Sequence, residues 1–231
     1  MDITYLYDIN SFHIYYVEEI ESTNTYLKEH YHEFPKPSVL IAKRQTKGRG
    51  RYDRVWKSDN DLIFSLLFDN LYYNEIIAPL SISLVLESKN IKAGIKWPND
   101  IYINSNKLSG VLIENIYSDK LLASIVGIGI NRTSKEDYSS VGLLDFLGDF
   151  SNMEFIKEVL IKYQELLNYE FSELISLYKK YSIVIGKKII YKNNIYTATS
   201  IDEFGHLVIS DDINEYHITS DEISIKESII E

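Results

Sequence analysis

A basic, glycine-containing segment from Gln45 to Trp56 (QTKGRGRYDRVW) holds side chains with a clear chemical use. The basic residues in and beside it are Lys43, Arg44, Lys47, Arg49, Arg51, Arg54 and Lys57, and Asp53 is the single acid among them. Guanidinium groups are forked donors that match the oxygens of phosphates and carboxylates. Gly48 and Gly50 are expected to let the backbone approach a ligand closely and to adopt positive φ. The segment predicts a local anion site, with an exposed basic turn as the plain alternative.

The net charge of the whole chain indicates which class of anion the basic segment could bind. The 231 residues carry a formal net charge of −10. Long-range attraction to nucleic acid needs an excess of positive charge, so a small ligand with a few phosphates suits one basic loop better than a polyanion does. The chain has no cysteine, which excludes a disulfide framework, a thiolate metal cluster and a cysteine nucleophile.

A second segment, Lys96 to Glu114 (KWPNDIYINSNKLSGVLIE), places a lysine at the start of a strand. Residues 101–103 and 107–114 are expected to form a hairpin about the turn formers at 104–106. Apolar runs at 38–42 and 62–68 predict two buried strands joined by the basic segment, and residues 121–130 predict another. Lys107 and Asn131 would then lie at strand ends.

The sequence also predicts several helices between and after these strands. Ser22, Thr23 and Asn24 offer N-cap residues for a helix that ends before Pro35. Residues 75–91 are predicted to form a mostly apolar helix, with Pro79 tolerated in its first turns, and residues 152–181 an interrupted amphipathic helical region. After residue 185, β-formers alternate with turn clusters, as in a small antiparallel barrel or sandwich. We therefore predict an α+β chain with domains at 1–184 and 185–231.

The sequence also bears on location and on metal binding. It has no run of about 18 uncharged apolar residues, and its acidic start (MDITYLYDIN) lacks the basic region of a signal peptide. We expect a cytoplasmic protein without a membrane partner. The five histidines show no metal-ligand spacing and are expected at the surface or at an interface.

Five short motifs follow one another along the chain. They are Ser22-Thr23-Asn24; Gln45 with Gly48-Arg49-Gly50-Arg51 and Trp56; Lys96-Trp97-Pro98-Asn99-Asp100; Lys107-Leu108-Ser109-Gly110; and Gly127-Ile128-Gly129-Ile130-Asn131. In this order and spacing they resemble the catalytic core of biotin protein ligases, over nearly the whole chain. The resemblance implies a mixed-sheet ligase domain followed by a small SH3-like β-barrel. It also implies the short form, without the N-terminal DNA-binding domain of some bacterial members.

The resemblance implies an ATP-dependent ligase. In that reaction the biotin carboxylate attacks the α-phosphate of ATP to give biotinyl-5′-AMP and pyrophosphate, and a lysine of a carrier domain then attacks the acyl carbon. Two like charges about 4 Å apart repel by roughly 4 kcal/mol at an effective dielectric of 20, so a sheltered site needs fixed cations. By resemblance Arg49, Arg51 and Lys107 are these catalytic cations, with Lys107 between the carboxylate and the phosphate. Taken alone, Lys107 would be interpreted as an ordinary solvated lysine of a hairpin, and it is the motif around it that favours the catalytic role.

The resemblance also assigns binding residues. Those for biotin are Ser22, Thr23, Asn24, Gln45, Arg49, Gly50, Arg51, Lys107 and Gly110. Those for ATP are Gly48, Arg49, Arg51, Trp56, Lys96, Asn99, Asp100, Lys107 and Asn131. Hydroxyls and amides suit the uncharged ureido head of biotin, which both donates and accepts hydrogen bonds. Trp56 and Asn131 are the candidates for stacking on adenine and pairing with its edge, and Asp100 for binding Mg²⁺. The structural alternatives are helix capping by Ser22 and Thr23, core packing of Trp56 and a plain turn at Asn99-Asp100.

Two other functions stay open. A lipoate-protein ligase shares the fold and the adenylate logic, and a non-catalytic module could bind phosphate or nucleic acid through the basic loop. The partner that the resemblance implies is a biotin carboxyl carrier protein or domain of a biotin-dependent carboxylase, and no DNA binding is expected. Exposed sheet edges leave a homodimer open.

Asp53 departs from the family pattern, in which such loops often carry a glycine at this position. Its carboxylate is placed to pair with Arg51 or Arg54, which would stiffen the loop or weaken its hold on the adenylate. We predict that Asp53→Gly tightens retention of biotin or of the adenylate. The check is the rate of ligand dissociation, and an unchanged rate would remove the idea.

Overall fold

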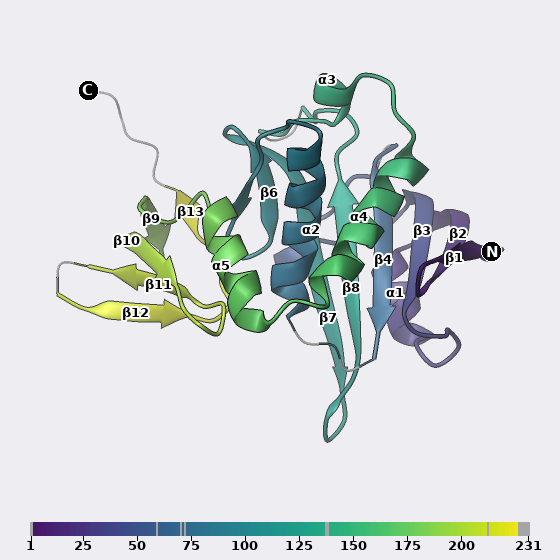
Figure 1. Cartoon of the computed structure of the whole chain (residues 1–231), viewed down its shortest axis with the longest axis horizontal. Helices are drawn as coiled ribbons and strands as arrows, with labels where there is room; N and C mark the ends of the chain where they lie inside the picture. The colour runs from purple at the N-terminus through teal and green to yellow at the C-terminus, as the bar shows by residue number, and fades with distance from the viewer. Residues whose placement is uncertain are drawn as a thin grey trace.

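An eight-stranded mixed sheet forms the centre of the larger part of the molecule (Figure 1). The structure is a computed structural model that describes residues 2–225 except 59, 70, 72, 137, 138 and 212, and the side chain of Asp53 also lies outside the described part. The strand order is β1-β2-β3-β4-β8-β7-β6-β5. The bounds are β1 Thr4–Ile9, β2 Phe12–Ile20, β3 Ser38–Gln45, β4 Leu62–Phe68, β5 Gly94–Lys96, β6 Asp100–Ile103, β7 Asn106–Tyr117 and β8 Leu121–Ile130. Strands β2 and β3 are parallel and the other neighbours antiparallel, which confirms the predicted mixed sheet.

Helices cover both faces of this sheet. Their bounds are α1 Thr23–Glu29, α2 Asn74–Ser88, α3 Leu144–Leu147, α4 Asn152–Leu166 and α5 Phe171–Tyr181, and a 3-10 turn, η1, spans Arg51–Asp53. Helices α2, α4 and α5 lie on one face, and α1 lies on the other (Figure 1). A large apolar cluster fills the first interface and a smaller one fills the second. The predicted helices are confirmed, including the break between α4 and α5, whereas the β1–β2 hairpin was not predicted.

Strand β4 has an almost continuously apolar sequence because both of its faces are buried. All its residues are buried, because one face meets the helical layer and the other meets α1. Phe64 and Leu66 join the large cluster, and Leu67 joins the smaller one. The polar exception is Ser65, which is fully buried on the side of α1. Its hydroxyl is therefore a buried polar group on an otherwise apolar strand.

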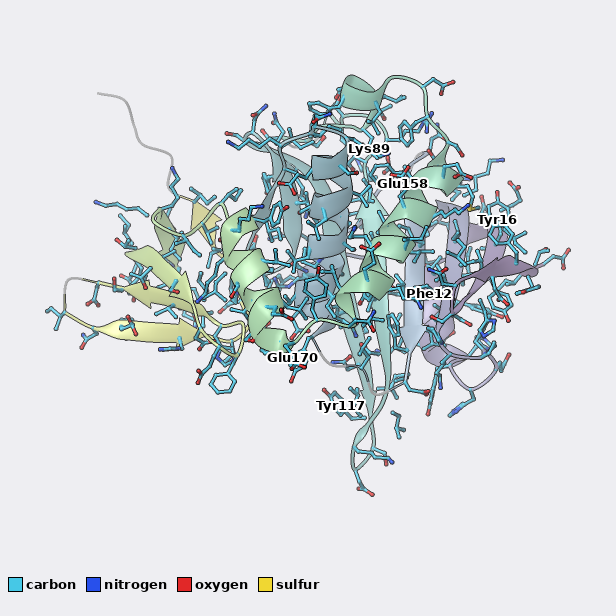
Figure 2. All side chains as sticks on the ribbon, viewed as in Figure 1. Phe12, Tyr16, Lys89, Tyr117, Glu158 and Glu170 are labelled. Carbon is cyan, nitrogen blue, oxygen red and sulfur yellow. The ribbon has the colours of Figure 1, made fainter. Side chains whose placement is uncertain are left out.

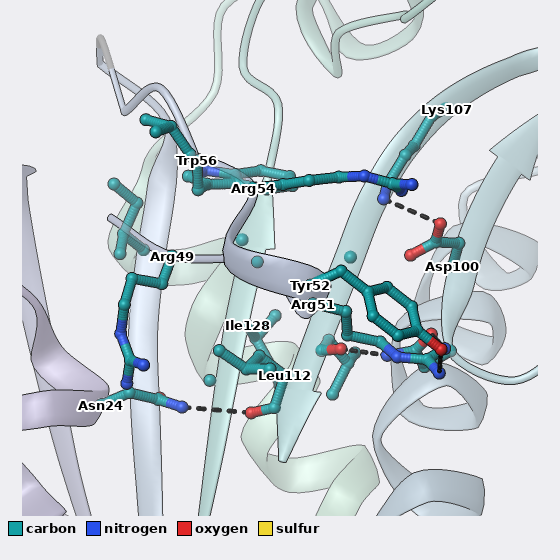
Figure 3. Close-up of a pocket in the computed structure, with 18 of the residues that line it drawn as sticks. Asn24, Arg49, Arg51, Tyr52, Arg54, Trp56, Asp100, Lys107, Leu112 and Ile128 are labelled. Carbon is teal, nitrogen blue, oxygen red and sulfur yellow. Dashed lines mark hydrogen bonds and ion pairs between the residues drawn. The ribbon is translucent and has the colours of Figure 1, made fainter. Parts of the chain in front are cut away.

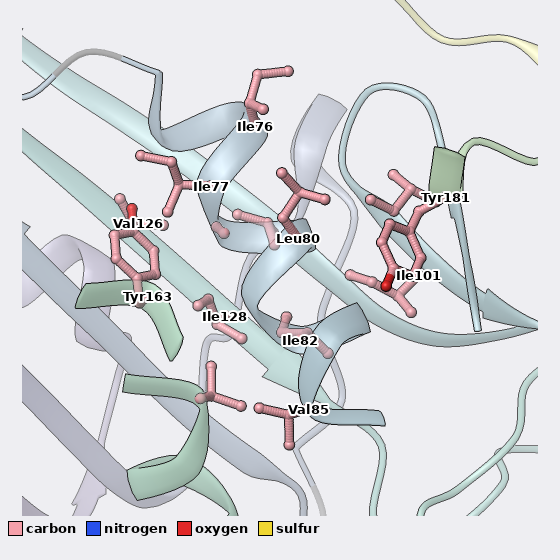
Figure 4. Packing of buried hydrophobic residues seen from close by; sticks show 14 of the residues in the cluster. Ile76, Ile77, Leu80, Ile82, Val85, Ile101, Val126, Ile128, Tyr163 and Tyr181 are labelled. Carbon is pink, nitrogen blue, oxygen red and sulfur yellow. The ribbon is translucent and has the colours of Figure 1, made fainter. Parts of the chain in front are cut away.

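Helix α2 is the centre of the large cluster. It is buried around most of its circumference because it lies between the sheet, α4 and α5. Figure 4 shows Ile77 and Leu80 of α2 packed over Val126 and Ile128 of β8. At the end of α2, Lys89 forms an ion pair with Glu158 of α4 (2.6 Å; Figure 2). No helix in the described ranges is long and apolar enough to span a membrane.

The last part of the chain forms a five-stranded antiparallel sheet, which matches the predicted small β-domain. Its order is β12-β11-β10-β9-β13. The bounds are β9 Lys188–Tyr191, β10 Asn194–Ile201, β11 Leu207–Ser210, β12 Glu215–Ile218 and β13 Ser224–Ile225. The inner residues Ile189, Ala198 and Leu207 belong to the same apolar cluster as α2 and α5. The indole Nε1 of Trp97 also donates a hydrogen bond to the Gly205 carbonyl across this interface (3.1 Å). The predicted boundary at residue 185 stays a prediction, and it lies between α5 and β9.

A buried hydrogen-bond chain links α4, α2 and β8. The Tyr163 hydroxyl donates to the Asn74 side-chain carbonyl, and the Asn74 amide donates to Ser124 Oγ (2.8 Å). Burial raises the pKa of Tyr163 well above its ordinary value, so the hydroxyl stays protonated as a donor.

We predict that Tyr163→Phe lowers the free energy of unfolding by about 1–3 kcal/mol, because it leaves a buried carbonyl without its donor. Urea unfolding monitored by circular dichroism checks this. Tyr169→Phe, at a side chain 46% exposed, is the matched control and should have little effect. Equal losses in the two variants would contradict the role of the buried hydroxyl.

Candidate functional site

A cavity of about 580 Å³ opens where the basic segment passes over the sheet (Figure 3). The segment leaves β3 and enters β4 at the end of the sheet where β7 begins and β8 ends. The motifs that are far apart in the sequence therefore meet at one place. The cavity is large enough for a small organic ligand. Its walls include α1, the segment 96–100 and Glu222 and Ile223 of the β-domain.

Neutral polar side chains line one end of the cavity. Gln45 Oε1 accepts hydrogen bonds from the Thr23 backbone N–H (2.7 Å) and from Thr23 Oγ1 (3.0 Å). Ser65 Oγ lies 2.6 Å from Thr23 Oγ1 and donates to Asn24 Oδ1 (2.7 Å). Ser22 caps α1 by accepting from the Thr25 N–H (3.4 Å), so capping and cavity lining coexist at this helix start. The predicted polar group is thus assembled. Ser65 does not line the cavity but supports Thr23 and Asn24 from behind, and its place as the one polar residue of an apolar strand could have signalled this.

Two glycines of β8 give the cavity its depth. A Cβ atom on Gly127 would lie 2.3 Å from Asn24 Oδ1, and one on Gly129 would lie 2.5 Å from Cε2 of the Trp56 indole. Gly129 also pairs with Gly110 of β7, which in turn pairs with Asp100 of β6. A bare strip of backbone therefore runs across the floor of the cavity. The predicted space beside Gly110 is part of this strip.

The basic residues divide into two groups. Lys43, Arg44 and Lys47 pair with Glu18, Glu19 and Glu21 on the surface, at 2.7–2.8 Å. Arg49, Arg51, Arg54 and Lys57 line the cavity. The expectation of seven basic side chains around one anion site is therefore wrong, because Glu18 and Glu19 of β2, and Glu21 directly after it, pair with three of them. The basic side chains that line the cavity all come after Gly48 in the chain.

The three arginines that line the cavity point in different directions (Figure 3). Arg49 Nη2 pairs with Glu114 Oε2 (2.7 Å) beside Asn24, at the polar end. Arg51 donates to Asn99 Oδ1 (3.4 Å) and to the carbonyl of Asp221 (3.1 Å). Arg54 forms an ion pair with Glu222. Arg51 therefore lies beside the segment 96–100, and Figure 3 shows Arg54 extending toward Lys107 and Asp100, whereas Arg49 lies at the other end beside Asn24.

Glycine conformation in the basic segment differs from the prediction. Gly50 has φ −113°, Gly48 is not among the positive-φ glycines, and the left-handed residue of this loop is Tyr52 (φ 55°). Gly48 is required instead by close approach, because a Cβ there would lie 2.5 Å from the Trp56 carbonyl oxygen. The Asp53 side chain, on which another prediction rests, lies outside the described part of the structure.

The other end of the cavity is cationic. Lys107 Nζ forms an ion pair with Asp100 Oδ2 (2.8 Å), and both side chains are mostly buried. Lys107 Nζ also lies 5.9 Å from the centre of the Trp56 ring. Burial lowers the pKa of Lys96, and the charge of Asp100 opposes that shift. The structure thus brings Lys96, Asn99, Asp100 and Lys107 together as predicted.

Trp56 lines the cavity, whereas Asn131 lies outside its lining. The Trp56 indole lies over Gly129, and its Nε1 is buried without a hydrogen-bond acceptor among the described residues, so it can donate to a ligand. Asn131 is fully buried and is not among the residues that line the cavity. Its amide donates to the Lys107 carbonyl (3.0 Å). Its position fits holding the Lys107 backbone better than the predicted contact with a base.

Two acids of the site were missed in the sequence. Glu114 accepts hydrogen bonds from Asn24, Lys28 and Arg49 at 2.7–3.1 Å. Burial alone would raise its pKa, but these hydrogen bonds outweigh burial and the pKa of Glu114 is lowered. The hydrogen bond from Arg54 lowers the pKa of Glu222. Glu222 comes from the β-domain, and no local sequence signal connects it to the basic segment.

Known proteins resemble this chain in sequence and in structure. Residues 16–131 match the model of the biotin/lipoate A/B protein ligase family. A bifunctional ligase/repressor BirA of Bacillus spizizenii is 28% identical over 197 residues, which cover 75% of this chain and 61% of that protein. Biotin–protein ligase 2 of Arabidopsis thaliana is 22% identical over 90% of this chain and 64% of its own length. The chain therefore spans less than two thirds of these curated relatives.

A solved structure covers more of the fold. Biotin protein ligase from Aquifex aeolicus in complex with biotin and ATP superposes with a TM-score of 0.79 and 31% sequence identity. The match covers 93% of this chain and 99% of that chain. The similarity thus includes the small β-domain as well as the large sheet.

The contact between Trp56 and Gly129 gives a testable prediction. We expect Gly129→Ala to lower the free energy of unfolding by about 1–3 kcal/mol, because the new methyl group overpacks against the indole. Urea unfolding of Gly129→Ala, Trp56→Ala and the double variant measures it. In the double variant the added methyl group should have little further effect. A full additive loss would show that the methyl group meets something other than the indole.

Proposed function

Because this chain belongs to the biotin/lipoate A/B protein ligase family, we propose that it is a biotin protein ligase. It would activate biotin with ATP as biotinyl-5′-AMP and transfer the biotinyl group to a lysine of a carrier domain. The observation that carries this proposal is a cavity with two different ends, connected by the glycine strip of β7 and β8. One end is lined by neutral polar side chains and closed by the Arg49–Glu114 ion pair, and the other end is cationic. A ligand with a neutral polar head and a carboxylate tail fits this polarity.

The polar end suits the ureido head of biotin. That head has two N–H donors and one carbonyl acceptor, while Thr23, Asn24 and Gln45 supply both kinds of partner. Ser65, buried behind them, holds Asn24 by a hydrogen bond. These side chains are neutral, so the head would be bound without a desolvated charge. Arg49 and Glu114 close this end as an ion pair.

The cationic end suits the reacting groups. Lys107 and Arg51 would offset the repulsion between the biotin carboxylate and the α-phosphate, and they would stabilise the negative charge that develops during transfer. Asp100 holds the Lys107 ammonium in place at 2.8 Å. The Lys107 backbone is fixed as well, since its N–H donates to the Ser139 carbonyl (3.0 Å) and its carbonyl accepts from Val141 (3.1 Å). Lys107 is therefore prepositioned for the reaction.

The nucleotide would occupy the side of the cavity formed by Trp56, Lys96 and Asn99. The Trp56 ring offers a face for adenine, and its buried Nε1 offers a donor. Asp100 lines the same region, and Mg²⁺ bound there would add positive charge to the phosphate oxygens, a role that one carboxylate and substrate oxygens can support. Lys96 would contribute a further cation.

Two other functions fit less well. The dithiolane ring of lipoate has no hydrogen-bond donor, and it would leave the polar end without ligand partners. A nucleic-acid module would need an extended basic surface, but three of the basic residues are already paired with surface acids. The proposal also includes a biotin carboxyl carrier protein or domain as the partner and a cytoplasmic location. Whether the chain forms a homodimer stays open.

We predict that Lys107→Ala lowers the rate of biotin-dependent pyrophosphate release from ATP by roughly 10²–10³-fold, as for loss of a transition-state donor. Parallel reactions with biotin, with lipoate and with neither acid identify the substrate. Lys120→Ala, an exposed lysine in the turn between β7 and β8, is the matched control and should retain the parent rate.

Three outcomes would contradict parts of this proposal. Release that needs lipoate instead of biotin would reassign the substrate. Release with neither acid, or none with either, would argue against a ligase. A Lys107→Ala rate within a fewfold of the parent would remove the catalytic role of that lysine.

A further inference from the structure

Three side chains with metal-ligating atoms converge in the β-domain, outside the cavity. Asp202 Oδ2 lies 3.1 Å from His206 Nδ1 and 2.7 Å from His217 Nδ1. The three ligating atoms all lie within 4.8 Å of one another. Asp202 and His206 flank the turn between β10 and β11, and His217 lies on β12 opposite Val208. The antiparallel register therefore brings together two histidines whose sequence spacing indicated no metal site.

The carboxylate is held in one orientation. Asp202 Oδ1 accepts the backbone N–H groups of Phe204 and His206, both at 2.9 Å. This leaves Oδ2 directed at the two imidazoles. The backbone of the turn thus presents one carboxylate oxygen, already aimed, to both ring nitrogens.

We propose that Asp202, His206 and His217 form a binding site for a divalent transition-metal ion of the Zn²⁺ class. Two imidazole nitrogens and one carboxylate oxygen are a donor set that suits Zn²⁺. In a tetrahedral Zn²⁺ site with bonds of about 2.0–2.2 Å, ligand atoms lie roughly 3.3 Å apart. The separation of 3.1 Å between Asp202 Oδ2 and His206 Nδ1 is near this spacing, and the separation of 2.7 Å to His217 Nδ1 is a hydrogen-bond distance that would have to widen for an ion to bind. The His206 and His217 side chains are 30% and 49% exposed, so an ion can enter and water can complete its coordination.

A fourth residue supports the same assignment. Glu215 Oε1 lies 3.6 Å from Nε2 of His217, the ring nitrogen that faces away from Asp202. Metal-bound histidines commonly direct their second ring nitrogen at a carboxylate, which fixes the tautomer and the ring orientation. A slight approach of Glu215 would complete this arrangement.

The turn that carries the site also contacts the large domain. Gly205 lies between Asp202 and His206 in the chain, and its carbonyl accepts the hydrogen bond from Trp97 Nε1. A Cβ on Gly205 would be in contact with Ile76 of α2 and Ile175 of α5. Metal binding would therefore hold the turn that joins the β-domain to the segment 96–100 of the cavity wall. The site does not depend on the proposed ligase activity.

Titration of the tag-free full-length chain with Zn²⁺, followed by isothermal calorimetry, tests the proposal. We expect one Zn²⁺ per chain and a higher thermal unfolding midpoint in its presence. His217→Gln and Asp202→Asn should each weaken binding at least about tenfold. Asp202→Asn retains an oxygen that can accept the two N–H groups of the turn, so it removes the charge with little change of the backbone. Circular dichroism without metal shows whether each variant is folded.

His30→Gln is the matched control, because His30 Nδ1 also lies 2.8 Å from a carboxylate, that of Glu33, outside this group. It should bind Zn²⁺ like the parent. Absence of stoichiometric binding to the parent would overturn the proposal, and the group would then be a hydrogen-bonded trio only. Equal affinity of His217→Gln and His30→Gln for Zn²⁺ would overturn it as well.

Discussion

Asn24 and Trp56 lie flat against strand β8, and this contact depends on two missing side chains. Cβ atoms on Gly127 and Gly129 would come within 2.3 Å and 2.5 Å of these side chains. Successive side chains of a strand point to opposite faces, so the two glycines share one face while Val126 and Ile130 enter the large core on the other. One strand therefore supplies a packed apolar face on one side and, on the other, a face without side chains at residues 127 and 129, against which Asn24 and Trp56 can pack. The polar and the cationic ends of the cavity are built around that second face.

Carboxylates organise the cations of the site before any ligand binds. Asp100 holds Lys107, Glu114 holds Arg49 and Glu222 holds Arg54. Lys107 depends most on its partner, because its side chain is mostly buried and would be disfavoured without its acid, whereas Arg49 and Arg54 are more exposed. An incoming anion would have to compete with these acids or rearrange them. This competition would make the site selective among anions. Only a ligand whose negative charges reach Lys107, Arg49 or Arg54 could replace their acidic partners.

Local patterns predicted most of the elements. The hairpin around residues 104–106, strand β8 and the capped start of α1 agree with the sequence, since each depends on neighbouring residues alone. The β1–β2 hairpin was missed, and the left-handed residue of the basic loop is Tyr52 instead of a glycine. Contacts between distant segments could not be predicted from one sequence. Glu222 reaches the cavity only through the docking of the β-domain, and His206 meets His217 only through strand register.

The β-domain and the part of the chain that contains the large sheet share one apolar core. Ile189, Ala198 and Leu207 pack in the same cluster as α2 and α5, and Ile223 reaches the cavity wall. The two sheets are thus separate in strand pairing on either side of residue 185, but they share a hydrophobic core. The two parts should melt together as one cooperative unit. Exchange of the small domain between related chains would consequently succeed only if the helical surface beneath it were exchanged as well.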